Sequence, residues 1–106
     1  MNLVSAQTQP STNIVGNEKI SAESEKLEIL AGNVNTTYQA YLNSATATKT
    51  ESDRIKQEYS VALDAYLTEL NSSLTLKRFA TLQTELQSEI SKVTELKTAV
   101  KGGGSR

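Results

Sequence analysis

Apolar side chains recur at nearly every third or fourth position from residue 55 to residue 100, and this spacing constrains the fold more than any other feature. The series is Ile55, Tyr59, Leu63, Tyr66, Leu67, Leu70, Leu74, Phe79, Leu82, Leu86, Ile90, Val93, Leu96 and Val100. Side chains spaced in this way lie along one face of an α-helix. No proline interrupts the series, and no glycine occurs in it before Gly102. The chain is therefore predicted to be an all-α protein held together by helix packing.

A second series with helical spacing precedes the first one. Its members are Ile20, Leu27, Leu30, Val34, Tyr38, Tyr41 and Ala45. Asn17 or Ser21 can cap the start of this helix, and the glutamates that follow, Glu18 among them, suit the positive end of a helix dipole. Gly32 is the one interior glycine, which a helix tolerates at a cost of about 1 kcal/mol.

Two polar stretches divide the helical residues, at 44–52 and at 71–75. Neither contains glycine or proline, so a break there is indicated only by clustered Ser, Thr and Asn. The prediction is an antiparallel three-helix bundle or coiled coil over residues 18–101, with helices at about 18–47, 52–71 and 74–101. The alternative is one short helix followed by a single long helix in a parallel oligomeric coiled coil.

Turns at these two places imply a register that can be tested, because facing residues must both be apolar. The expected pairs are Tyr41 with Tyr59 in the first hairpin, and Tyr66 with Phe79, Leu63 with Leu82, Tyr59 with Leu86 and Ile55 with Ile90 in the second. Ile90 then faces the start of the second helix, so the last helix extends beyond the bundle. Its unpaired residues, Val93, Leu96 and Val100, are predicted to bind a partner protein.

Residues 1–17 are rich in Ser, Thr, Gln and Asn, contain the only proline, and show no sustained period. They are predicted to form a flexible N-terminal arm. Its two apolar pairs, Leu3 with Val4 and Ile14 with Val15, are candidate contacts to a partner. Residues 102–106 are predicted to be a flexible Gly-rich tail.

Composition argues against several classes of function. The chain of 106 residues has no Cys and no His, so thiol chemistry, the commonest zinc ligands and the usual general base are missing. A net charge of -1 provides no field to attract nucleic acid or an anionic membrane. The carboxylates Glu85, Glu89 and Glu95 alternate with lysines and are expected to form a solvated face. No enzyme activity, metal, cofactor or small-molecule substrate is predicted.

No signal peptide or membrane-spanning run is visible, which predicts a protein kept inside a cell or packaged into a particle such as a virion. The predicted function is that of a non-enzymatic structural or assembly protein that acts through helix–helix contacts. Homo-oligomers, or incorporation into a larger assembly such as a virion, are expected. The alternative is a regulatory adaptor or secretion-type helical hairpin that binds partner proteins.

Overall fold

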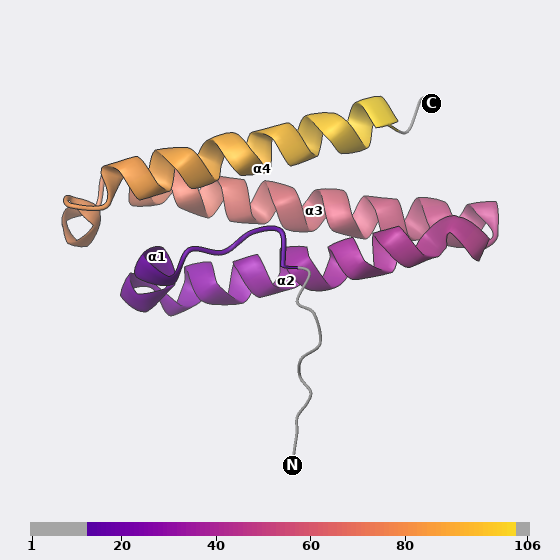
Figure 1. The fold of residues 1–106 in the computed structure, drawn as a ribbon, viewed down its shortest axis with the longest axis horizontal. Coiled ribbons are helices and arrows are strands. Elements are labelled where there is room, and N and C mark those ends of the chain that lie inside the picture. The colour runs from indigo at the N-terminus through magenta and orange to yellow at the C-terminus, as the bar shows by residue number, and fades with distance from the viewer. Residues whose placement is uncertain (1–12, 104–106) are drawn as a thin grey trace, which may run out of the picture.

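The computed structural model describes residues 13–103, and within this range it is helical with no strand (Figure 1). The helices are α1 (Glu18–Glu23), α2 (Glu25–Leu42), α3 (Lys49–Ser73) and α4 (Gln83–Gly103), with 3-10 turns η1 (Asn43–Thr46) and η2 (Lys77–Phe79) between them. The predicted all-α class is confirmed. The chain turns back after α2 and again after α3, so the structure does not contain the alternative single long helix.

The first predicted helix is interrupted at Ser24 and ends earlier than expected, at Leu42. Ser24 has an extended backbone, with φ -153° and ψ 113°, and its Oγ accepts a hydrogen bond from the backbone N–H of Leu27 at 3.3 Å. This cap supplies a partner for one of the free N–H groups that begin α2. The break also lets α1 fold against the bundle, where Ile20 is fully buried.

The first turn overlaps the predicted stretch 44–52, although both flanking helix ends lie a few residues earlier, and its register is the predicted one. Asn43–Thr46 form η1, and the Thr48 Oγ1 then caps α3 by accepting from the N–H of Glu51 at 3.1 Å. Across this hairpin the rings of Tyr41 and Tyr59 stack with centroids 5.1 Å apart, which confirms the predicted pair.

The second turn is longer than predicted, because α4 begins at Gln83 and not near residue 74. Phe79 lies in this turn and is fully buried, so its ring belongs to the core although its backbone does not continue an α-helix. The Gln83 Nε2 donates to the carbonyl oxygens of Leu74 and Phe79, each at 3.1 Å, and so satisfies turn groups that a helix would have paired.

The longer turn shifts α4 along α3 and makes the predicted second register wrong. The Tyr66 hydroxyl contacts Glu89, and Asp64 pairs with Lys97, so the α4 residues opposite this part of α3 lie well beyond the predicted partner Phe79. The predicted overhang is therefore wrong as well. Val93 and Val100 are 0% and 3% exposed and Leu96 packs against the core, so these side chains are occupied within the chain. The prediction that they bind a partner depended on their being unpaired within the chain, which they are not.

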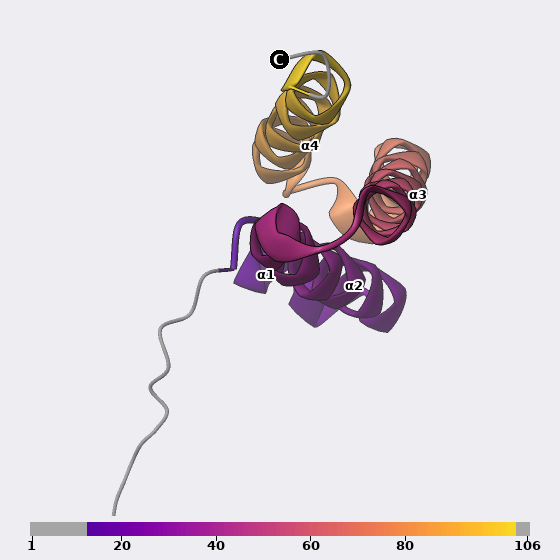
Figure 2. The same ribbon diagram turned by 90° about the vertical axis from the view of Figure 1, so that its right-hand side faces the viewer.

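The three long helices are arranged as an open bundle, with α3 packed against both α2 and α4 (Figure 2). The interfaces of α3 with α2 and with α4 are the two most extensive, and no comparable one joins α2 to α4. The N-terminal residues that precede α2 lie on the side where α2 and α4 are left unjoined (Figure 2). The start of the described chain bridges these two helices, because Ile14 donates to Asn35 on α2 and Gly16 donates to Glu89 on α4. The surface of α2 and α4 that it covers is called the groove between α2 and α4.

Candidate functional site

Residues Asn13–Asn17, here called the strap, run in an irregular path beside α2 before α1 begins (Figure 1). Val15 is buried in the core and Ile14 packs against it. The prediction of a flexible arm over residues 1–17 is thus wrong for the strap, because these apolar side chains dock within their own chain. Leu3 and Val4 lie outside the described residues.

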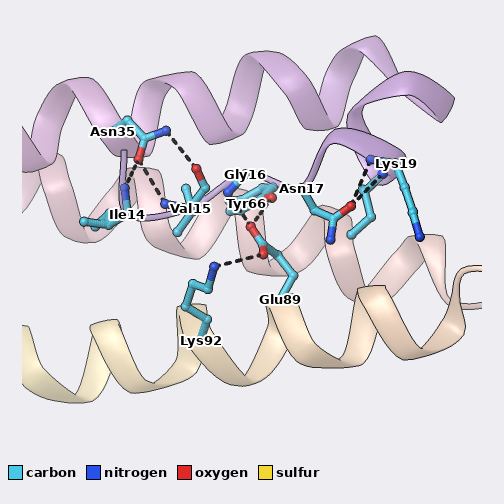
Figure 3. A network of polar contacts seen from close by, with 10 residues as sticks. Ile14, Val15, Gly16, Asn17, Lys19, Asn35, Tyr66, Glu89 and Lys92 are labelled. Carbon is cyan, nitrogen blue, oxygen red and sulfur yellow. Dashed lines mark hydrogen bonds and ion pairs between the residues drawn. The ribbon is translucent and has the colours of Figure 1, made fainter. Parts of the chain in front are cut away.

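The carboxamide of Asn35, on α2, holds the middle of the strap (Figure 3). Its Oδ1 accepts from the N–H groups of Ile14 at 2.8 Å and Val15 at 3.1 Å. Its Nδ2 donates to the carbonyl oxygen of Val15 at 3.0 Å. One amide side chain therefore pairs with three backbone groups of the strap, as a neighbouring strand would.

The carboxylate of Glu89, on α4, holds the end of the strap and is 3% exposed. Its Oε2 accepts from the N–H of Gly16 at 2.7 Å and from the hydroxyl of Tyr66 at 2.6 Å (Figure 3). Lys92 lies 3.6 Å from Oε1. A buried carboxylate is tolerated only when hydrogen bonds and opposite charge replace its lost hydration, and this site supplies both.

The predicted solvated face is therefore wrong for Glu89, whereas Glu95 is exposed as expected and Glu85 pairs with Lys19 at 3.6 Å. A signal was present in the sequence. Glu89 lies three residues after Leu86 and four before Val93, so it falls on the apolar face of its own helix.

The surroundings of Tyr66 keep its hydroxyl protonated, so that it acts as a hydrogen-bond donor. Burial raises the pKa of its hydroxyl far above the ordinary value, and the hydrogen bond to Glu89 and the negative charge of that carboxylate raise it further. The phenol therefore stays protonated at neutral pH, as its role toward Glu89 requires.

Gly16 supplies the backbone shape that links the strap to α1. Its φ is +125°, a value that side-chain-bearing L-residues rarely adopt, although no atom lies within 4 Å of where a Cβ would stand. Glycine is therefore required here by the backbone conformation and not by a lack of space for a Cβ. This shape accompanies the hydrogen bond from the Gly16 N–H to Glu89.

A second candidate surface is the outer groove, defined as the shallow depression between α2 and α3 that Lys26, Leu30, Val61, Asp64, Ala65, Thr68 and Glu69 line. Its floor is apolar, and Val61 is 55% exposed. Its rim carries an ion pair across the two helices, with the Lys26 Nζ 3.3 Å from the Glu69 Oε1. The sequence did not single out Val61, because it falls off the main apolar series.

The tyrosines near the first turn form a packed cluster. Tyr59 is buried between the rings of Tyr38, at 5.6 Å, and Tyr41. Burial, followed by electrostatic coupling to the two neighbouring phenols, raises the pKa of Tyr59 to about 12. This arrangement is that of core residues, as the helical spacing predicted, with Tyr66 held apart at Glu89.

Between residues 13 and 103, no three His, Cys, Asp or Glu side chains are grouped so that they could hold a metal ion. In the same part of the chain, no helix has the length and apolar character needed to cross a membrane. No protein-family model matches the sequence, and no curated protein or solved structure is significantly similar to it.

Proposed function

We propose that this protein is a non-enzymatic structural component that assembles by helix packing between copies of itself. The observation that carries the proposal is the exposed apolar floor of the outer groove. Single exposed apolar side chains are ordinary on protein surfaces, but an apolar depression with a charged rim is typical of an interaction surface. Leu30, Val61 and Ala65 share one such depression, with Lys26 and Glu69 at its rim.

The shape of the outer groove suits a helix as its occupant. Side chains of one helix form ridges that pack into the grooves of another. The chain also carries an exposed apolar side chain on α2 outside the lining of this groove, since Ile29 is 55% exposed. A second copy related by a two-fold axis would present the same groove in return, so that the contact would pair this surface with itself.

The expected affinity is low for an isolated pair. Complete burial of a Val or Ile side chain contributes roughly 1.5–3 kcal/mol, so a half-exposed one contributes about 1 kcal/mol. A two-fold axis makes each contact occur twice. Burial of Val61 and Ile29 then contributes a few kcal/mol, from which the entropy cost of association is subtracted. Weak contacts of this kind become effective when many copies are held together, as in a large particle such as a virion.

Sedimentation equilibrium over a wide concentration range tests the proposal. The wild-type chain is expected to form concentration-dependent oligomers, and Val61→Lys is expected to weaken them at least tenfold without altering the helical circular dichroism. Thr94→Lys is the matched control, because Thr94 is also exposed on a helix but lies outside the outer groove. Equal association of the two variants, or a wild-type chain that stays monomeric throughout, would overturn the proposal.

A further inference from the structure

Ser24 is an unusual place for a helix to break. The residues on either side of it form helices, and neither glycine nor proline lies at the break. What favours the break is the Ser24 cap on Leu27, together with burial of Ile20 when α1 folds back. A helical Ser24 would instead join α1 and α2 into one continuous helix, the structure that the sequence pattern alone favours.

The groove between α2 and α4 recognises the strap in a way that any copy of the chain can satisfy. Asn35 and Glu89 bind the strap through its backbone groups, and Val15 and Ile20 add the apolar contacts. The covalent connection from the strap and α1 to α2 runs through the single residue Ser24. An identical segment from another copy would therefore make the same contacts.

We propose that the groove between α2 and α4 is also a docking site for residues 13–23 of a second copy, exchanged when Ser24 becomes helical. The six residues of α1 would then extend α2 by roughly 9 Å and carry the strap away from its own groove. The vacated groove would expose the core residues against which Val15 and Ile20 now pack, so it requires an occupant. Reciprocal exchange fills both grooves and closes a two-fold dimer.

This inference rests on the proposed self-assembly but concerns another surface. Two substitutions at the hinge between α1 and α2, at Ser24 and Glu25, test whether the exchange occurs. Ser24→Ala removes the cap and raises helix propensity, which should favour the continuous helix about tenfold per chain. Glu25→Pro should oppose it by more than about a hundredfold, since a proline inside a helix removes a hydrogen bond and clashes with the preceding turn.

Glu25→Pro is compatible with the structure as it stands. Glu25 is exposed and is the first residue of α2, a position that proline occupies readily because its N–H has no partner within the helix. Proline also holds the residue before it in an extended conformation, which Ser24 already has. The substitution should therefore preserve the monomer fold and block only the exchange.

Cross-linking between two different chains reads out the exchange. Asn13 on the strap and Lys92 on α4 line the same cleft, and the native chain contains no cysteine. A chain with Asn13→Cys is mixed with a chain with Lys92→Cys and treated with a short bismaleimide. Replacing the second chain by one with Thr98→Cys, exposed on α4 outside that cleft, measures random collision.

The expected result is a covalent heterodimer above the collision level, increased about tenfold in yield or rate by Ser24→Ala in both chains and abolished by Glu25→Pro. A heterodimer no more abundant than the collision control, while a single chain carrying both cysteines cross-links internally, would overturn the exchange. A heterodimer whose yield changes with neither Ser24→Ala nor Glu25→Pro would also overturn the proposed exchange. Oligomers that respond to Val61→Lys but not to the hinge would leave the proposed function standing without the exchange.

Discussion

The hydrogen bond between Tyr66 and Glu89 provides a sharp test of the polar network. Tyr66→Phe keeps the buried ring and removes only the hydroxyl that donates to the Glu89 Oε2 at 2.6 Å. Hydrogen bonds to charged groups contribute about 1.5–3 kcal/mol, and Glu89 keeps its contacts with Gly16 and Lys92 after the substitution. The free energy of unfolding should therefore fall by about 2 kcal/mol.

Urea denaturation followed by circular dichroism measures this loss. The midpoint should decrease while the slope with denaturant stays constant, because the buried surface is unchanged. Tyr41→Phe is the matched control, since the Tyr41 ring also packs on the core but its hydroxyl has no hydrogen-bond partner among residues 13–103. If the two substitutions lower stability equally, or if Tyr66→Phe changes it by less than about 0.5 kcal/mol, the reasoning about Glu89 is refuted.

Two further predictions concern strap docking and pH. Asn35→Ala removes three hydrogen bonds to Ile14 and Val15 and should raise amide hydrogen exchange in the strap at least tenfold, with exchange in α3 unchanged; equal change in both would contradict local release. Above pH 10 the folded state should lose stability, because Tyr59, with a pKa of about 12, and Tyr66 keep their protons in the folded chain after unfolded tyrosines have lost theirs. Unfolding measured from pH 8 to 11 should show this decline, and Tyr59→Phe should make it shallower.

The helical class and the first hairpin could be predicted because they depend on local periodicity. Tyr41 and Tyr59 flank a short turn, so small errors in its length leave the pairing intact. The prediction of the second hairpin was wrong because its turn is much longer than the sequence pattern indicated. Phe79, Leu82 and Leu86 have helical spacing although the first two lie in the turn before α4, and periodicity cannot separate an apolar residue in a helix from one that a turn inserts into the core.

The strap could not be predicted from local pattern. Gly16 and Glu89 are 73 positions apart, and their contact depends on how α4 packs against α3. The break at Ser24 also depends on tertiary packing, since burial of Ile20 and Val15 outweighs the preference for a continuous helix. Only the apolar register of Glu89 in its own helix indicated that this carboxylate would be buried.

The central claim, self-assembly through the outer groove, is tested most directly by an intermolecular distance. A single spin label at Thr68, which lines the groove, is compared with one at the exposed Thr94, both in chains that carry Glu25→Pro so that strap exchange cannot contribute. Pulsed dipolar spectroscopy should give a defined distance between copies that is shorter at Thr68 and that disappears with Val61→Lys. No dipolar signal at Thr68 at high concentration, or a signal that survives Val61→Lys, would contradict the claim.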